Sequence, residues 1–481
     1  MVRYKWTVLI ITTIGVFMSS LDGSIVNIAI PSLSRDLKTS FEVIQWIPII
    51  YLLIQAVTLI SFGRLSDLKG RKLFFLFGIF LFAFASLLST FVTSGITLVI
   101  FRAIQGIGSS FIAANAPSMI TDVFPREETG KALGINVATI YLGLIIGPVL
   151  GGLIVQFSTW RLIFFINVPI GIILIIVGWF KLKKVNPGIK EERFDIWGTL
   201  FFMSFLVTLL LALTIANLFG WGSIQVILLL SISISSISLF IYIESRTKYP
   251  LFKLSLFRVN RIFSFGNFAA LLNYTTISGV SFLLSIYLQS ILGISPAITA
   301  LYLLPTTITM ATIAPLSGRF SDKWGTRTLT TLGMVIMAIG FAILSTIIRF
   351  LPLIYILITQ FIVGFGIGLF SSPNNSAIMN AVEPRDHGIA AGTLSTMRVV
   401  GQSISVALLS AILTLFIPLS ILNPIISNSI LITDPIAKQE FVAGMQILLI
   451  VSSIICSAGA ILSFMRGKKI LNDNVDFKKP I

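Results

Sequence analysis

Fourteen apolar stretches, each about as long as a membrane-spanning helix, dominate this sequence of 481 residues. A helix needs about 20 mostly apolar residues to cross the hydrocarbon core of a bilayer, and polarity does not alternate along the stretches as it would in barrel strands. We therefore predict an all-α polytopic membrane protein with fourteen transmembrane helices. The stretches lie at about 7–30, 43–62, 73–93, 96–121, 132–156, 162–180, 196–216, 224–243, 262–290, 297–316, 328–348, 352–374, 388–416 and 441–465.

Composition excludes a soluble protein of this length. Hydrophobic residues make up 56% of the chain and charged residues 11%, whereas a typical soluble domain is about 45–50% apolar and about 25% charged. So few charges could not cover the surface of a water-soluble fold. The single cysteine, Cys456, also excludes a disulfide scaffold.

The basic residues predict how the chain is oriented. With the N-terminus inside, 27 of the 34 Lys and Arg residues lie on inside segments, five lie in outside loops, and Arg102 and Arg398 lie within spans. Cytoplasmic loops collect positive charge, and one helix more or fewer would reverse the side of every later loop. We therefore predict fourteen spans in the plasma membrane with both termini cytoplasmic. The net charge of +16 then reflects topology and does not predict a nucleic-acid partner.

The chain contains an internal repeat. The segment Gly63–Lys72 recurs 255 residues later as Gly318–Arg327, and Pro125-Arg126 recurs 259 residues later as Pro384-Arg385. Two matches at nearly one offset indicate two similar six-helix halves, a pattern typical of transporters. The predicted parts are an N-terminal six-helix bundle at 1–185, a linker with transmembrane helices 7 and 8 at 186–254, a C-terminal six-helix bundle at 255–470, and a cytoplasmic tail at 471–481.

Four motifs carry a resemblance to a known family. They are the loop Gly63–Lys72 after the second span, Leu21–Pro31 in the first span, Arg102–Gly108 in the fourth and Gly143–Gly152 in the fifth. Together they resemble the major facilitator superfamily, and within it the fourteen-span branch of drug:proton antiporters. The resemblance covers nearly the whole chain. It implies two bundles that alternate access to a central site, and the fifth-span motif favours export over uptake.

Asp22 and Arg102 are the predicted proton-coupling residues. Asp22 is the only carboxylate placed deep in a span, where an acid is normally paired or faces a water-filled cavity. Burial disfavours its charged form and a nearby cation favours it, so such an acid can bind and release a proton. Arg102 stays charged and can only tune a neighbour. The alternatives are a static hydrogen bond for Asp22 and a static ion pair or a carbonyl-capping role for Arg102. Sequence leaves open whether the two residues meet.

A second set of residues is expected to control conformational change. Gly143, Gly147 and Gly151 recur every fourth residue on one helix face, and Pro148 bends the same helix. This span could therefore seal or rock the two halves. The alternative is that the glycines only allow close helix packing. Asp67 beside basic residues predicts an ion-pair latch; the alternative is a positive anchor that only sets topology. The gating candidates are Gly63, Asp67, Gly70, Arg71, Gly143, Gly147, Pro148, Gly151, Gly152 and Asp322.

Polar and aromatic residues on the spans are candidates for a substrate cavity at the membrane midplane. Many of them are expected to serve helix packing instead. Arg398 could tune an acid, as Arg102 does, or contact an anionic substrate group. Relatives that export dications are expected to use additional acids within the membrane, and no acid lies deep in the last six spans of this chain. The resemblance therefore implies neutral or monocationic lipophilic substrates. The candidates are Asn27, Gln55, Asn115, Asn136, Tyr141, Asn273, Tyr274, Gln289, Asn374, Arg398 and Gln402.

Signatures of catalysis are missing from the sequence. The one histidine, His387, lies in an expected cytoplasmic loop, and no phosphate-binding G-x-x-x-x-G-K-[ST] sequence occurs. We therefore predict no enzyme activity, metal or cofactor. The predicted function is proton-coupled antiport, exporting lipophilic drugs, by a monomer whose partners are its substrates, protons and the lipid bilayer. The alternatives are a dedicated exporter or facilitator of one metabolite, or a transporter-derived sensor that moves nothing.

Overall fold

The computed structural model of the protein describes residues 2–183, 195–247, 250, 252–348, 353–383, 387–417, 422 and 435–467. Within these ranges the chain is helical and contains no strand. Fourteen segments are long and apolar enough to cross a membrane. The predicted all-α fold with fourteen spans is therefore confirmed, and the observed helices extend the predicted apolar stretches at several ends, because polar residues continue the helix beyond the apolar core.

The first half of the chain contains eight helices. They are α1 (Val2–Asp36), α2 (Phe41–Ile44), α3 (Trp46–Lys69), α4 (Arg71–Thr90), α5 (Gly95–Thr121), α6 (Arg126–Phe157), α7 (Arg161–Phe165) and α8 (Asn167–Lys181). The short helices α2 and α7 extend α3 and α8, so that each pair makes one span. This half therefore supplies six of the fourteen candidate spans.

The rest of the described chain follows in two groups. The middle pair is α9 (Ile196–Phe219) and α10 (Ile224–Glu244). The later helices are α11 (Leu254–Val259), α12 (Arg261–Ile286) with the π-helical turn η1 (Tyr287–Ile291), α13 (Pro296–Trp324), α14 (Thr326–Ile347), α15 (Ile354–Asn380), α16 (His387–Phe416) and α18 (Pro435–Met465). We call α1–α8 the N-half and α12–α18 the C-half.

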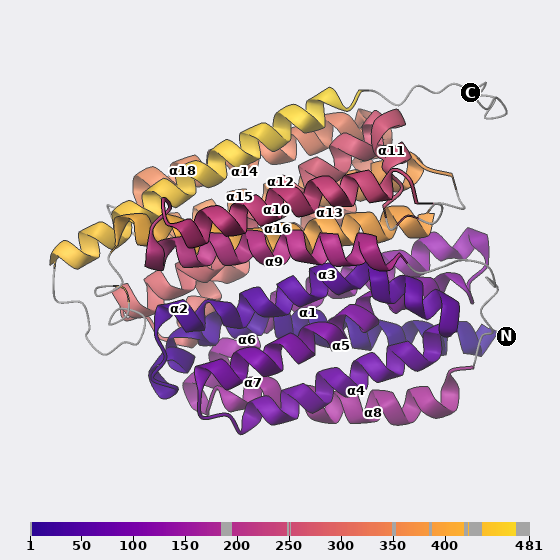
Figure 1. Cartoon of the computed structure of the whole chain (residues 1–481), viewed down its shortest axis with the longest axis horizontal. Helices are drawn as coiled ribbons and strands as arrows, with labels where there is room; N and C mark the ends of the chain where they lie inside the picture. The colour runs from indigo at the N-terminus through magenta and orange to yellow at the C-terminus, as the bar shows by residue number, and fades with distance from the viewer. Residues whose placement is uncertain are drawn as a thin grey trace.

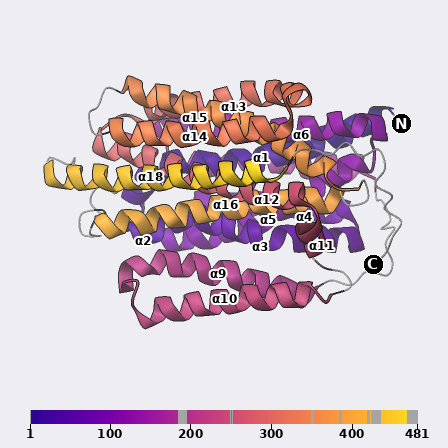
Figure 2. The ribbon, with the colours of Figure 1, turned by 90° about the horizontal axis from the view of Figure 1, so that it is seen from above.

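The two halves lie side by side with their long helices nearly parallel (Figure 1). α1 begins and α18 ends at the same end of the molecule, which we call the basic end because the predicted inside segments lie there. In the view from above, α9 and α10 flank one side of the molecule, away from α13 and α6 (Figure 2). The middle pair packs on α16 and on α3, and so on one helix from each half.

The same tight turn joins two helices in each half. Gly70 separates α3 from α4 with φ of +109°, and Gly325 separates α13 from α14 with φ of +79°. Both values lie in a region that side-chain-bearing residues rarely adopt, which explains glycine at these positions. The two glycines are 255 residues apart, so the sequence repeat recurs as a backbone turn.

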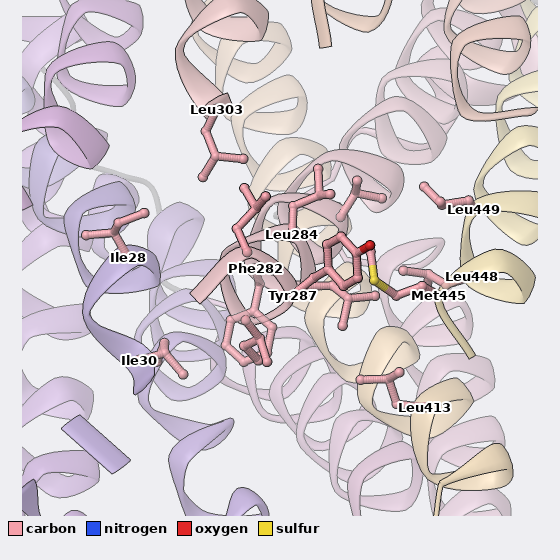
Figure 3. Packing of buried hydrophobic residues seen from close by; sticks show 14 of the residues in the cluster. Ile28, Ile30, Phe282, Leu284, Tyr287, Leu303, Leu413, Met445, Leu448 and Leu449 are labelled. Carbon is pink, nitrogen blue, oxygen red and sulfur yellow. The ribbon is translucent and has the colours of Figure 1, made fainter. Parts of the chain in front are cut away.

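The largest apolar cluster joins the halves at the end opposite the basic end. Figure 3 shows Ile28 and Ile30 of α1 beside Phe282 of α12 and Leu303 of α13, with further residues of the C-half behind them. All four are buried, with exposed fractions of 7% or less. The halves are therefore packed together by side chains at this end of the molecule.

Candidate ion-coupling and substrate sites

Asp22 and Arg102 form a buried ion pair inside the N-half. Asp22 lies midway along α1 and Arg102 in the first third of α5, and both side chains are 0% exposed. The Nη1 group of Arg102 donates to Oδ2 of Asp22. The pairing that sequence left open is therefore present, and it joins two helices whose paired residues are far apart in the chain.

Neutral amides complete the surroundings of the pair. Asn167, the first residue of α8, donates from Nδ2 to Asp22 Oδ1 over 2.8 Å, and Gln105 donates to the same oxygen over 3.4 Å. Arg102 also donates to Gln105 Oε1 over 3.0 Å and to the Ile47 carbonyl over 3.3 Å. Both carboxylate oxygens of Asp22 thus accept hydrogen bonds, while Nη2 of Arg102 has no partner in the described structure.

A hydroxyl cluster adjoins the pair. The Tyr51 ring lies 4.1 Å from the Arg102 guanidinium carbon, a cation–π contact. Its hydroxyl donates to Ser109 Oγ over 2.9 Å, and Ser109 Oγ also lies 2.5 Å from Ser19 Oγ. Gln55 donates to the same Ser109 oxygen over 2.7 Å. Gln55, a substrate candidate, is therefore held within the N-half network that surrounds the ion pair.

The glycine row of α6 faces α1. A Cβ at Gly143 would lie 2.9 Å from the Leu21 nitrogen, one at Gly147 1.9 Å from Ser24 Oγ, and one at Gly151 2.9 Å from the Ile25 carbonyl oxygen. These three glycines therefore pack α6 against the helix that carries Asp22. Pro148 lies within α6 between them.

Gly152 differs from the rest of the row because it faces the C-half. A Cβ at this position would lie 2.7 Å from the Pro296 carbonyl oxygen and 3.0 Å from Ala300 Cβ, both on α13. The glycine motif thus contains three positions that pack within the N-half and one that lets the two halves meet. Only Gly152 of the motif fits the predicted contact between halves directly.

Hydrogen bonds reinforce the apolar packing between the halves. Ser285 donates to the Asn27 carbonyl over 3.1 Å, and Gln289 donates to the Ile28 carbonyl over 3.0 Å. The Ala297 amide donates to Gln156 over 3.2 Å. We call these bonds, with the apolar cluster around Ile28, the seal. Asn27 and Gln289, two substrate candidates, belong to the seal.

Arg71 holds together an ion-pair latch at the basic end. Its Nε donates to Asp67 over 2.7 Å, and its Nη1 donates to Asp122 over 2.5 Å and to the Ser118 carbonyl over 3.3 Å. The latch therefore joins α3, α4 and the end of α5 within the N-half. Lys72 donates instead to the carbonyls of Trp179 and Leu182 at the end of α8.

Two gating candidates add little to this picture. A Cβ at Gly63 would meet only Ala114 Cβ, at an ordinary contact distance of 3.5 Å. The side chain of Asp322 lies outside the described residues, as do Pro384 and Arg385 of the second repeat.

Several substrate candidates are buried within one half. Asn115 donates to Ser66 Oγ over 3.0 Å and to the Phe111 carbonyl over 2.7 Å. Asn273 donates to the sulfurs of Met334 and Met337 over 3.3 and 3.0 Å. Their exposed fractions are 1% and 0%, and this geometry favours helix packing over substrate contact.

Asn374 and Asn136 are also buried. Asn374 donates to the Gly266 carbonyl and accepts from Arg466, each over 3.1 Å. Arg466 is only 2% exposed, so this arginine just after α18 is buried against α15. The Asn136 amide nitrogen has no partner in the described structure.

The remaining candidates meet between the halves. Tyr274 of α12 lies beside Tyr141 of α6 and Ser371 of α15, and it is within electrostatic range of the charge on Arg398 of α16. Gln402 lies one turn beyond Arg398, and both side chains are partly exposed. Tyr274, Tyr141 and Arg398 lie near the middle of their helices. We call Tyr141, Tyr274, Arg398 and Gln402 the central cluster.

Several residues that contact the predicted sites were not predicted from the sequence, because their residue types alone do not mark them as functional. Asn167 and Tyr51 of the ion-pair site, Asp122 of the latch and Ser371 beside the central cluster were not among the candidates. Asn167 directly follows α7 near the start of a span, where an amide also serves as a helix-end residue. Asp122 follows the end of α5 and lies 51 residues after Arg71 in the chain, so the packing of α4 against α5 brings the two side chains together.

Comparison with known proteins assigns the chain to a family. The family model of the Major Facilitator Superfamily matches residues 12–406. The riboflavin transporter RibZ of Clostridioides difficile strain 630 is 35% identical over 85% of this chain and 88% of its own length. The multidrug resistance protein Stp of Mycobacterium tuberculosis H37Rv is 29% identical over 91% and 80%, and multidrug resistance protein 3 of Bacillus subtilis strain 168 is 30% identical over 83% and 78%.

Solved structures agree on the fold. A bacterial homologue of the human lysosomal transporter Spinster, in an inward-facing and unoccupied conformation, superposes with a TM-score of 0.67 at 15% identity, covering 96% of this chain and 97% of that one. The xylose transporter XylE of E. coli gives a TM-score of 0.61 at 13% identity over 95% and 98%. With its fourteen spans and a family match over most of its length, the chain is a multi-pass membrane transporter of the major facilitator superfamily.

Proposed function

We propose that this transporter is a proton-coupled antiporter that exports lipophilic compounds across the plasma membrane by alternating access. It works as a monomer without a cofactor, uses the proton gradient as its energy source, and has both termini in the cytoplasm. The observation that carries the proposal is the Asp22–Arg102 pair, the one mid-span acid with its own cation among the described residues. The relatives named multidrug resistance proteins support export of diverse compounds.

Protonation of Asp22 would disturb the pair in a defined way. A neutral carboxylic acid no longer compensates Arg102, whose guanidinium stays charged and is fully buried. A buried charge without a partner is strongly unfavourable, so the helices that hold it must rearrange or admit water. Proton binding therefore changes the preferred packing of α1 against α5.

α1 transmits that change to the seal. Asn27 and Ile28 lie less than two turns beyond Asp22 on the same helix, and their carbonyls accept the bonds from Ser285 and Gln289. The glycine row ties α6 to this stretch of α1 with almost no free space. A shift of α1 would thus move the N-half side of the seal relative to the C-half, which couples protonation to opening at the end opposite the basic end.

A second candidate function is transport of a single metabolite. It is favoured by RibZ, a relative named as a riboflavin transporter that is 35% identical over most of both chains. A riboflavin transporter would move the vitamin and ignore structurally diverse drugs. The polar central cluster fits either function, so a direct transport measurement must separate them.

The test uses energised inverted vesicles, in which efflux appears as uptake. Uptake of a panel of lipophilic fluorescent dyes, both cationic and anionic, and of riboflavin is compared for wild type, Asp22→Asn and Asp36→Asn, with and without a protonophore. Asp36 is a matched control because it is an exposed carboxylate at the end of the same helix, where it pairs with the partly exposed Arg161 and accepts a hydrogen bond from Trp160. We expect dye uptake that is abolished by the protonophore and by Asp22→Asn but retained in Asp36→Asn.

Three other results would argue against the proposal. Uptake that survives Asp22→Asn but not the protonophore would assign coupling to another group. Uptake of riboflavin alone would favour the metabolite transporter. Binding of substrates without any uptake would favour a sensor.

A further inference from the structure

The second mid-span arginine is in a different environment from the first. Arg102 is fully buried and paired with Asp22, whereas Arg398 is partly exposed and no carboxylate among the described residues pairs with it. A charged side chain at mid-membrane depth normally has a partner or faces water. Arg398 therefore retains capacity to bind an anionic group, since no carboxylate in the described part of the chain neutralises it.

Helix packing places Arg398 on the face of α16 that packs against α12. Gly401, one turn further along α16, packs against α12 so closely that a Cβ would lie 2.6 Å from the Leu271 carbonyl oxygen and 3.0 Å from Tyr274 Cβ. Residues three apart share a helix face. Arg398 is thus on the side of α16 that meets Tyr274, which lies against Tyr141 of the N-half.

The groups around Arg398 suit one kind of ligand. Tyr141 and Tyr274 offer aromatic faces and hydroxyl groups, one from each half, and Gln402 offers an amide one turn from the guanidinium. A planar guanidinium binds carboxylates and phosphates through two parallel hydrogen bonds. Aromatic rings stack on flat ring systems.

We propose that the central cluster is the substrate site and that it selects aromatic compounds carrying an anionic group, such as a carboxylate or phosphate. This inference rests on the proposed function and narrows its substrate class, replacing the sequence-based expectation of neutral or monocationic compounds. Arg398 binds the anion, Tyr274 and Tyr141 contact the ring, and Gln402 donates to an acceptor at its edge. Because the tyrosines come from different halves, a bound substrate contacts both bundles.

Two dyes with the same ring system and opposite charge test the inference. Fluorescein is an anion at neutral pH, and a rhodamine ester is a cation on a similar tricyclic ring. Binding of each dye to purified full-length protein is measured by fluorescence polarisation, and uptake into inverted vesicles is measured in parallel. The variants are Arg398→Gln, Arg398→Lys and the control Arg258→Gln, which removes an exposed arginine of α11.

We expect wild type to bind fluorescein more tightly than the rhodamine. Arg398→Gln should weaken fluorescein binding by about tenfold to 100-fold, as loss of a charge-assisted hydrogen bond does, and leave rhodamine binding within twofold. Arg398→Lys keeps the charge and should bind fluorescein within about tenfold of wild type. Arg258→Gln should match wild type for both dyes.

Other outcomes distinguish this inference from the proposed function. Equal effects of Arg398→Gln on both dyes, or none, would overturn the selectivity claim. Asp22-dependent uptake of the rhodamine without binding of fluorescein would overturn it as well and leave proton-coupled export intact. Arg398-dependent fluorescein binding without uptake of either dye would support the site and contradict the export proposal. If Arg398→Gln does not fold, the wild-type preference and the Arg398→Lys result still decide the question.

Discussion

The Asp22–Arg102 pair makes a prediction about stability that is separate from transport. Both side chains are 0% exposed, so removing either charge leaves the other buried without its partner. Loss of one member of a buried pair typically costs about 3–5 kcal/mol, whereas neutralising both members together is often nearly neutral. The variants Asp22→Asn, Arg102→Gln and the double variant therefore form an informative cycle.

The surrounding contacts refine the expected values. Asp22→Asn leaves the guanidinium with Gln105 and the Ile47 carbonyl, and Arg102→Gln leaves the carboxylate with Asn167 and Gln105. We expect each single variant to lose about 3–5 kcal/mol of unfolding free energy. The double variant can replace the pair with amide hydrogen bonds and should lose no more than about 2 kcal/mol, as in other fully neutralised pairs.

The assay is reversible unfolding in mixed micelles, followed by tryptophan fluorescence and extrapolated linearly to zero denaturant. The cycle isolates the coupling energy between the two residues, which should be at least about 4 kcal/mol, because two single losses of about 3 kcal/mol or more are set against a double loss of no more than about 2 kcal/mol. A double variant as unstable as the sum of the singles would refute a mutually compensating pair. An Asp22→Asn variant as stable as wild type would show that Asp22 carries no charge in the resting protein. Transport should be lost in all three variants, including the stable double.

Three further predictions follow from contacts elsewhere. Gly152→Ala should abolish transport in the vesicle assay while the protein is still produced, because the added Cβ would meet the backbone of the C-half. The control is Gly134→Ala on the same helix. It should transport normally, because nothing lies within 4 Å of a Cβ at that position. Arg71→Gln should reduce transport severalfold. Because the latch is partly exposed, the same variant should lose only about 1 kcal/mol of unfolding free energy. A loss of several kcal/mol of unfolding free energy would show that the latch is structural. A variant that lacks Cys456 and carries Asn27→Cys and Ser285→Cys should form a disulfide across the seal on oxidation, and transport should stop until the disulfide is reduced. Full transport activity with the disulfide formed would contradict opening at the seal.

The spans and the repeat could be predicted because each depends on local sequence. A helix must present about 20 apolar residues to the bilayer wherever it lies in the bundle, so hydropathy and loop charge determine the count. The turns at Gly70 and Gly325 are likewise local, since each needs one residue with positive φ.

The contacts inside the bundle could not be predicted in the same way. Lipid-facing and core-facing sides of these helices are both apolar, so periodicity does not reveal which polar residues face the centre. Asn115, Asn273, Tyr141 and Gln402 are all polar residues within apolar spans, so the sequence does not separate them. In the structure, Asn115 and Asn273 are buried within one half. The pairing of Asp22 with Arg102 depends on how α1 packs on α5, which chain order does not specify.

The position of α9 and α10 has a consequence for how molecules reach the transporter from within the bilayer. The halves meet along two lines, α6 against α13 and α3 against α16, and α9 covers the second, where Ser61 of α3 and Thr199 of α9 lie 3.0 Å apart. A lipophilic molecule diffusing in the membrane would meet the wall of α9 and α10 on that side (Figure 2). We therefore expect α9 and α10 to block lateral exchange with the lipid on the α3–α16 side, and not at the contact between α6 and α13.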